Sequence, residues 1–251
     1  MNERLYIVTG ASRGMGEAIA GALLAPGHTV WGLSRGTSER LQARAAQAGA
    51  TLAQWQLDLA DPLPAAARLE QALQALPPDR FAGVALINNA ALVSAPGPLQ
   101  DTPAAELSAA LRVGLEAVLL LSAGYVRATA AWRGERKLLN ISSGLGRRAM
   151  AGAAAYCAMK AGMDHFTRAL ALEQAGQPNP VKVVSLAPGV IDTGMQQQLR
   201  SADPGRFPER ERFAQLKAQG LLDSPEQAAA KVLAWLERRD FGANPVADVR
   251  D

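Results

Sequence analysis

Tyr156 and Lys160 stand four positions apart, and Ser143 precedes the tyrosine by thirteen residues. Residues four apart share one face of a helix, so this phenol and this ammonium can point to a common place. A phenol beside an ammonium can donate a proton, and a nearby hydroxyl can bind an oxygen that gains negative charge. The same spacing also fits an ordinary amphipathic helix with one half-buried ring and one solvated charge, so a second motif has to support the chemistry.

A glycine-rich turn near the amino terminus is that second motif. The apolar run 5–8 predicts a strand, and residues 17–24 predict a helix. Between them, Gly10 can make the tight turn, Gly14 leaves room for a phosphate beside the backbone, and Gly16 lets the helix pack closely. The free N–H groups at the start of that helix would bind an anion. A plain glycine-rich turn is the alternative, but its place directly after the first strand favours a phosphate site.

The two motifs together resemble the short-chain dehydrogenases/reductases. The segments that carry the resemblance are Thr9 to Gly16, Asn88-Asn89-Ala90, Ser143, Tyr156 to Lys160, and Pro188 to Thr193, and the likeness runs from about residue 4 to residue 248. Within that family, the segments around Tyr156 and from Ala187 to Gln197, with the tail near Asp248, look most like sepiapterin reductases and their bacterial diketone-reducing relatives. The resemblance implies an oxidoreductase that reduces a small carbonyl compound.

The resemblance also implies roles for individual residues. Ser143, Tyr156 and Lys160 would be catalytic, with Ser143 binding the substrate oxygen and Tyr156 acting as the acid. Free tyrosine has a pKa of about 10, so we expect Lys160 and a positive nicotinamide to lower the pKa of Tyr156. The residues expected around the cofactor are Gly10, Ser12, Arg13, Gly14, Met15, Gly16, Ser34, Arg35, Asp58, Leu59, Asn88, Ala90, Tyr156, Lys160, Pro188, Gly189, Ile191 and Thr193. Those expected at the substrate are Ser143, Tyr156, Met195 and Asp248.

The charge beside the second strand indicates which dinucleotide binds. NAD sites of this type usually carry an acid at the end of that strand, but here the strand ends in Ser34-Arg35. Arg35, with Arg13 from the glycine turn, could hold a 2′-phosphate through the guanidinium fork. Two solvent-facing loop arginines are the alternative. We therefore predict NADP(H) as the cofactor.

Two positions depart from the family pattern. The helix after the fourth strand usually carries an Asn that holds a water for proton relay to the lysine, and Gly114 stands there instead. Either a solvent molecule fills the gap or the proton path differs. Ala91 replaces a common Gly after Asn88-Asn89-Ala90, which is a smaller change.

Asp248 is the residue from which a substrate can be predicted. An acid at this place in sepiapterin reductases accepts hydrogen bonds from the pterin ring, and a carboxylate suits a donor-rich heterocycle. The alternative is a solvated acid on a frayed terminal strand, because only Arg250 and Asp251 follow Val249. We expect reduction of a pterin side-chain ketone or a vicinal diketone. Reduction of a 3-oxoacyl thioester, sugar or steroid is one rival; a catalytically idle dinucleotide-sensing protein is another.

Apolar runs that alternate with helical patterns predict the elements that hold these residues. Strands are expected at 4–9, 28–34, 51–56, 83–88, 136–142, 181–186 and 245–248, and helices at 15–25, 38–48, 64–75, 103–131, 154–175 and 225–238. This order indicates a single-domain α/β fold over 1–251, a doubly wound (Rossmann) parallel sheet of about seven strands with helices on both faces. Ligands of such sheets lie beyond the carboxyl ends of the strands, where each motif falls. Residues 194–222 interrupt the alternation and predict a partly helical flap over the substrate.

Composition limits the classes of partner. The net charge of +3 is small for 26 basic and 23 acidic residues, and no dense basic block occurs, so no nucleic-acid partner is expected. Arg147-Arg148 is the nearest approach, and it is either a solvated loop pair or an anion-attracting rim. His28 and His165 lack partners at metal-ligand spacing, so no metal is assigned. The single cysteine, Cys157, cannot form an internal disulfide.

The expected setting is a cytoplasmic homodimer or homotetramer. The chain enters a strand almost at once, which leaves no room for a secretory signal, and the longest uncharged stretch, 81–100, contains two Pro and is no membrane span. Apolar faces on the expected helices 103–131 and 154–175 suit self-association, and the resembling family pairs these helices in a four-helix seam.

Overall fold

The computed structural model describes residues 3–251, which form one parallel sheet in the strand order β3-β2-β1-β4-β5-β6-β7. The strands are β1 (Arg4–Thr9), β2 (His28–Ser34), β3 (Thr51–Gln56), β4 (Gly83–Asn88), β5 (Glu135–Ile141), β6 (Val181–Ala187) and β7 (Val246–Asp248). The predicted α/β class and doubly wound parallel sheet are confirmed, with strand boundaries shifted by one residue at most. The order reverses between β1 and β4, and a crevice at the carboxyl ends of the strands is expected there.

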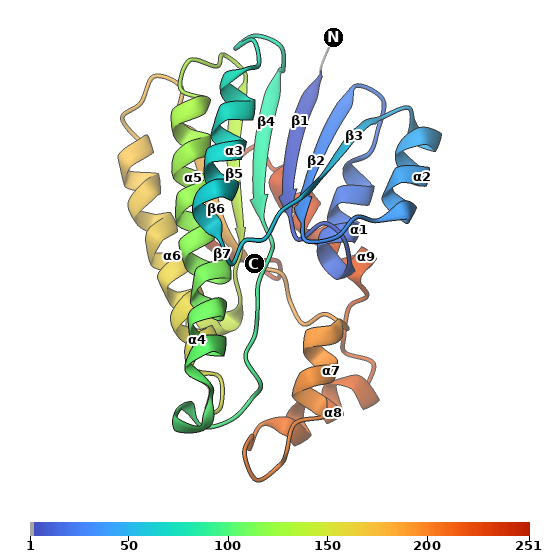
Figure 1. The fold of residues 1–251 in the computed structure, drawn as a ribbon, viewed down its shortest axis with the longest axis vertical. Coiled ribbons are helices and arrows are strands. Elements are labelled where there is room, and N and C mark those ends of the chain that lie inside the picture. The colour runs from blue at the N-terminus through green and yellow to red at the C-terminus, as the bar shows by residue number, and fades with distance from the viewer. Residues whose placement is uncertain (1–2) are drawn as a thin grey trace.

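Helices cover both faces of this sheet (Figure 1). They are α1 (Gly14–Leu23), α2 (Glu39–Ala48), α3 (Pro62–Gln74), α4 (Ala104–Leu111), α5 (Ala117–Ala128), α6 (Ala154–Gln174), α7 (Gly194–Arg200), α8 (Arg210–Ala218) and α9 (Pro225–Leu236). One face packs against α1, α2 and α9, and the other against α3, α5 and α6. Figure 1 shows α7 and α8 standing away from the sheet, on the side to which the strands run.

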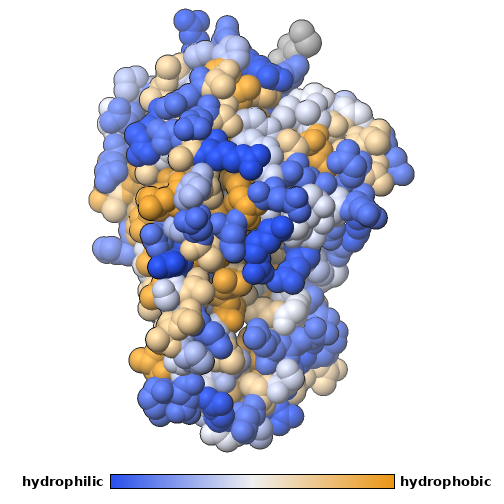
Figure 2. Space-filling model, viewed as in Figure 1, coloured by the Kyte–Doolittle hydropathy of each residue, from blue (hydrophilic) through white to orange (hydrophobic). Residues whose placement is uncertain are grey.

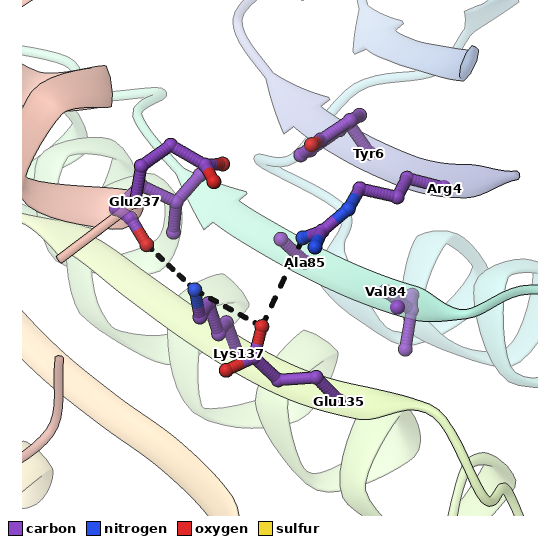
Figure 3. Close-up of a pocket in the computed structure, with 9 residues that line it drawn as sticks. Arg4, Tyr6, Val84, Ala85, Glu135, Lys137 and Glu237 are labelled. Atoms are coloured by element: carbon purple, nitrogen blue, oxygen red, sulfur yellow. Dashed lines mark hydrogen bonds and ion pairs between the residues drawn. The ribbon is translucent and has the colours of Figure 1, made fainter. Parts of the chain in front are cut away.

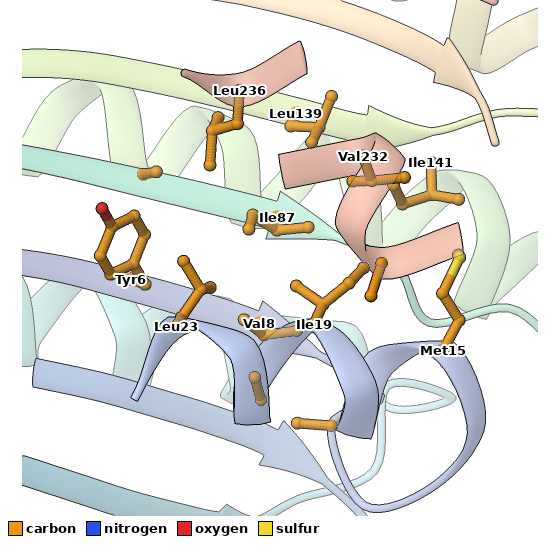
Figure 4. Packing of buried hydrophobic residues seen from close by; sticks show 14 of the residues in the cluster. Tyr6, Val8, Met15, Ile19, Leu23, Ile87, Leu139, Ile141, Val232 and Leu236 are labelled. Atoms are coloured by element: carbon orange, nitrogen blue, oxygen red, sulfur yellow. The ribbon is translucent and has the colours of Figure 1, made fainter. Parts of the chain in front are cut away.

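The strands are apolar on both sides because each face has its own helical layer. Ile87 of β4 lies in the core beneath α1 and α9, while its neighbour Leu86 lies in the core beneath α3 and α5. Successive strand side chains point to opposite faces, so a continuous apolar run fills both cores. Figure 4 shows the first core, where Ile19 and Val232 from the two helices approach the sheet.

The predicted helix 103–131 is interrupted by one wider turn. Between α4 and α5, residues Arg112–Glu116 form a π-helical turn, η2. Single π turns inside α-helices are frequent at functional sites. The stretch Ala104–Ala128 has a mean hydropathy of 1.6 and is long and apolar enough to cross a membrane. Its α5 part packs on α3 in the core, and a core helix of a soluble fold passes the same test of length and composition.

A small cavity at the amino ends of β1, β4 and β5 is filled by charge pairing (Figure 3). Glu135 lies 3.1 Å from the Nζ of Lys137 and 3.8 Å from a guanidinium nitrogen of Arg4, and Lys137 also donates to the Leu236 carbonyl at 2.7 Å. The volume is about 10 Å³, enough for one water. This cavity is therefore too small for a ligand larger than water.

Candidate active site

A cleft of about 1100 Å³ lies at the carboxyl ends of the strands. Its walls come from the glycine turn, the ends of β2, β3, β5 and β6, the segment after β4, and helices α6, α7 and α8. Figure 2 shows the surface narrowing on the right-hand side, between the body of the molecule and the α7 and α8 segment. The topology of the sheet thus brings the separate sequence motifs to one place.

The glycine turn has the backbone shape that a phosphate needs. Gly10 has φ 69° and Gly14 has φ 59°, which are left-handed conformations that favour glycine. A Cβ on Gly16 would lie 2.2 Å from the Gly10 carbonyl oxygen, so no side chain fits there. A Cβ on Gly14 would meet nothing within 4 Å, which leaves open space at the start of α1. The cradle fits a dinucleotide phosphate, which the first N–H groups of α1 would bind.

Arg13 and Arg35 are exposed and line the same end of the cleft. Ser34 is buried at the end of β2, so the first exposed side chain after this strand is a guanidinium instead of an acid. Asp58 lines the cleft after β3, and one of its carboxylate oxygens accepts a hydrogen bond from the Ala60 N–H at 2.9 Å. Asp58 is thus held by its own loop, while Arg13 and Arg35 are exposed in the cleft.

Asn88 does not reach the cleft. It is 1% exposed, and its side chain donates to Asn140 Oδ1 at 2.9 Å and to Ser122 Oγ at 3.3 Å inside the core. The next residue, Asn89, lines the cleft and donates from its side chain to the Thr9 carbonyl at 2.9 Å. Asn89 therefore lines the cleft at the end of β4 while the side chain of Asn88 lies in the core, and the predicted place of Asn88 along the cofactor stays a prediction.

Ser143, Tyr156 and Lys160 meet in the wall of the cleft. Tyr156 and Lys160 lie on the first turns of α6, and Lys160 Nζ is 5.8 Å from the centre of the Tyr156 ring. Nζ is buried and donates to the Ile141 carbonyl at 2.6 Å, which holds the ammonium at the end of β5. Ser143 follows the same strand, and its Oγ accepts the Leu145 N–H at 3.2 Å. The loop after β5 and the start of α6 thus bring the three side chains to one wall of the cleft.

Burial dominates the acidity of this group. It raises the pKa of Tyr156, and the hydrogen bond from Ser143 opposes that rise. It lowers the pKa of Lys160 to about 8, and the Asp164 carboxylate opposes that fall. The expected lowering of the pKa of Tyr156 by Lys160 is therefore not seen with the protein groups alone, because removal of the phenol from water outweighs its neighbours. A positive nicotinamide stays as the predicted source of that lowering.

Met159 fills the space beside Gly114. A Cβ built on Gly114 in the π turn would lie 1.6 Å from the sulfur of Met159, and Met159 is fully buried. An Asn side chain has no room there while this sulfur is in place. The two alternatives offered by the sequence for the proton path to Lys160 stay predictions, and Lys160 itself lines the cleft.

Asp164 is a buried acid that sequence analysis missed. It lies one helical turn after Lys160, and its Oδ1 accepts hydrogen bonds from Ser142 Oγ at 2.5 Å and from Ser185 Oγ at 2.7 Å. Its Oδ2 has no hydrogen-bond partner within residues 3–251, and Arg147 Nε lies 3.5 Å away. The i, i+4 spacing from Lys160 is the signal that could have revealed it.

Arg147 contacts the protein through its guanidinium group, although its side chain is 34% exposed. Its guanidinium donates to the Ala247 carbonyl at 2.8 Å, beside Asp248 at the end of β7. Asp248 lines the cleft and is 6% exposed, and both of its carboxylate oxygens accept hydrogen bonds from the Arg250 side chain. Arg148 lines the cleft, so the loop after β5 contributes one structural and one cleft-facing arginine.

The interruption at 194–222 contains α7 and α8, in agreement with a partly helical segment. Met195 lines the cleft as expected, and so does Phe213 of α8. Asp192 joins the two helices: its carboxylate lies 3.2 Å from Arg200 Nη1 of α7 and also pairs with Lys217 of α8. These two cations lower the pKa of Asp192, with Lys217 the larger cause.

Most of the residues predicted at the site line this one cleft; Gly14 and Asn88 do not. Those that do are Gly10, Ser12, Arg13, Met15, Gly16, Ser34, Arg35, Asp58, Leu59, Ala90, Ser143, Tyr156, Lys160, Pro188, Gly189, Ile191, Thr193, Met195 and Asp248. Within residues 3–251, no group of three His, Cys, Asp or Glu side chains is placed to hold a metal ion. The polar side chains that line the cleft are hydroxyl, ammonium, guanidinium, amide and carboxylate groups.

The family model for short chain dehydrogenases matches residues 4–204. The chain is a short-chain dehydrogenase. Members of this family of oxidoreductases use a nicotinamide dinucleotide and act on small molecules, and the glycine cradle described above fits such a cofactor. The resemblance stated from the sequence motifs is confirmed.

Two relatives and one solved structure show how far this short-chain dehydrogenase resembles known proteins. Benzil reductase ((S)-benzoin forming) of Bacillus subtilis (strain 168) is 37% identical, over 93% of both chains. Sepiapterin reductase of Rattus norvegicus is 33% identical, over 98% of this chain and 95% of the relative. The structure of a putative NAD(P) dependent gluconate 5-dehydrogenase from Beutenbergia cavernae is 29% identical with a TM-score of 0.80, over 99% of this chain and 96% of the other.

Proposed function

We propose that this short-chain dehydrogenase is an NADPH-dependent carbonyl reductase of vicinal diketones, with Tyr156 as the general acid. The observation that carries the proposal is that Ser143, Tyr156 and Lys160 face a cleft whose other end is flanked by Arg13 and Arg35. The benzil reductase relative supports a diketone as the substrate. A pterin side-chain ketone is a second candidate, supported by Asp248 in the wall of the cleft and by the sepiapterin reductase relative.

The chain's own groups would bind and protonate the substrate. The bound dinucleotide supplies the hydride for the carbonyl carbon. Ser143 donates a hydrogen bond to the carbonyl oxygen and shares its developing charge, and Tyr156 transfers its proton to that oxygen. Lys160 stabilises the tyrosinate that remains, and it binds the ribose hydroxyls of the cofactor. Since Met159 blocks the side of Gly114, the proton that restores Tyr156 enters from the cleft.

The remaining groups of the cleft have roles in positioning. Arg13 and Arg35 hold the 2′-phosphate, Asp58 lies at the adenine, and Thr193 contacts the carboxamide. Residues 194–222 cover the substrate as a flap, with Met195 against it. The bidentate fork of arginine matches a phosphate, which supports NADP(H) over NAD.

Self-association is part of this proposal. Leu119 on α5 and Leu172 on α6 are 38% and 79% exposed, although both helices also carry core residues. Burying such apolar surface against a second copy is favourable, so we infer a homodimer or homotetramer through these helices. The proposed location is the cytoplasm.

A direct assay tests the proposal. The purified protein is mixed with benzil and either NADPH or NADH, and cofactor oxidation is followed with the release of the hydroxyketone. Turnover with NADPH, and a loss of the preference for NADPH over NADH in the Arg13→Ala/Arg35→Ala variant, are the expected results. If NADPH is oxidised neither with benzil nor with a panel of other dicarbonyls, the alternative of a catalytically idle dinucleotide-sensing protein is favoured. A preference of the native protein for NADH would contradict the role of Arg13 and Arg35 in binding the 2′-phosphate.

A further inference from the structure

Asp248 is paired with Arg250 through both of its carboxylate oxygens. Its Oδ1 accepts the Arg250 N–H at 3.1 Å and Arg250 Nε at 2.6 Å, and its Oδ2 accepts Arg250 Nη2 at 2.5 Å. The guanidinium fork therefore covers both oxygens at once. Charge-assisted bidentate pairs of this kind are among the stronger hydrogen bonds in proteins.

The two partners differ in their access to solvent. The Arg250 side chain is 70% exposed, while the Asp248 side chain is 9% exposed. Both line the cleft, so a ligand that enters from solvent meets the guanidinium before the carboxylate. The cleft carries further positive side chains, because Arg148 and Arg212 also line it. Asp248 also lies near Arg147, and Arg250 and Arg147 together lower the pKa of its carboxyl group.

This arrangement suits one of the two proposed substrates and opposes the other. A pterin ring presents N–H donors, which need a free acceptor and are repelled by a guanidinium. A vicinal diketone presents two carbonyl acceptors and apolar flanks, which suit exposed N–H donors and the side chains of Leu145, Met195 and Phe213 in the cleft.

We propose that Arg250 determines substrate specificity by masking Asp248, so that the site selects vicinal diketones against pterins. The inference rests on the proposed carbonyl reductase function and assigns its substrate class. A carboxylate that would serve a pterin is present, and the second residue after it pairs with its charge and donates hydrogen bonds to both of its oxygens. The site thus discriminates against the pterin through the unfavourable guanidinium of Arg250 as much as through favourable contacts to the diketone.

The test compares the ratio of kcat/KM for sepiapterin to kcat/KM for benzil in the native protein and in Arg250→Ala. Unmasking Asp248 is expected to raise this ratio about tenfold, the effect of gaining one charge-assisted hydrogen bond. Adding Asp248→Asn to that variant should return the ratio to the native value, since the gain depends on the unmasked carboxylate. A ratio that stays the same in Arg250→Ala would overturn the inference.

Arg238→Ala is the matched control. Arg238 makes the same pair with Asp240, two residues away, through Nε at 2.9 Å and Nη2 at 2.8 Å. It does not line the cleft, so its loss should leave the substrate ratio unchanged. If Arg238→Ala raises the ratio as much as Arg250→Ala does, the effect comes from general loosening and the inference fails.

Failure of the reductase function would be seen separately. If the native protein oxidises NADPH with neither substrate, the proposed function is wrong, and the masking is then measured by binding alone. Sepiapterin is titrated into the native protein and into Arg250→Ala with its fluorescence as the readout. About tenfold tighter binding to the variant supports the masking, and equal affinity overturns it.

Discussion

Lys160→Met is expected to stabilise the fold while it removes catalysis. Burial lowers the pKa of Lys160 from an ordinary 10.5 to about 8, a difference that corresponds to about 3 kcal/mol against folding at pH 7. Methionine fills a similar volume without a charge. Loss of the hydrogen bond to the Ile141 carbonyl costs about 1 kcal/mol, so we expect the free energy of unfolding to rise by about 2 kcal/mol.

The pH dependence identifies the cause of that gain. Below pH 8 the ammonium is protonated in the folded and unfolded states, so the full cost of burying it is present. Between about pH 8 and 10.5 the folded protein loses this proton first, so the native protein becomes more stable as pH rises. The variant lacks this rise, and the stability difference should shrink towards zero or change sign.

Urea unfolding of both proteins at pH 7, 9 and 10 measures the free energy of unfolding directly. Reductase activity of the variant is measured on the same samples. Two results would contradict the prediction: Lys160→Met is no more stable than the native protein at pH 7, or the stability difference does not change with pH. Either result would mean that burying the charge of Lys160 does not destabilise the fold.

Three further predictions concern the surroundings of the site. Gly114→Ala should destabilise the native protein by about 1 kcal/mol, since its methyl overlaps Met159, and should be neutral or stabilising in a Met159→Ala background. Urea unfolding in a double-mutant cycle measures both effects, and an equal loss of stability in the two backgrounds would exclude the contact. Asp164→Asn should lower the pKa of Lys160 further and move the basic limb of the pH profile of kcat to lower pH; an unmoved limb would contradict the charge coupling. Arg35→Asp should weaken NADPH binding by about tenfold or more, measured by fluorescence titration, while NADH binding stays equal or improves; equal loss for both cofactors would indicate a structural role.

The fold could be predicted because each layer leaves a local trace in the sequence. Apolar runs such as that of β4 are buried on both sides, and these runs alternate with helical patterns over the whole chain. Each motif follows a strand, and the strand order then brings the motifs together without further information. Gly10 and Gly16 could be interpreted individually, because the backbone angle of one and the close packing of the other admit no side chain.

The features that sequence reasoning missed depend on contacts between elements. The sulfur of Met159 beside Gly114 joins α6 to the π turn, and a pattern within one helix does not show which neighbour fills a gap. Asn88 and Asn89 could not be distinguished, because a strand with two buried faces has no polar alternation to indicate which Asn leaves the core. The pairing of Asp248 with Arg250 joins residues only two positions apart. Its importance could not be predicted because the sequence does not show that both side chains line the cleft.

Replacement of the Tyr156 hydroxyl tests the central claim most directly. In Tyr156→Phe the ring and its packing remain while the proton donor is gone. We predict that kcat with NADPH and benzil falls by about 10²- to 10⁴-fold while the affinity for NADPH stays within about threefold of the native value. A kcat that remains within about twofold of the native rate would contradict the proposal that this phenol delivers the proton.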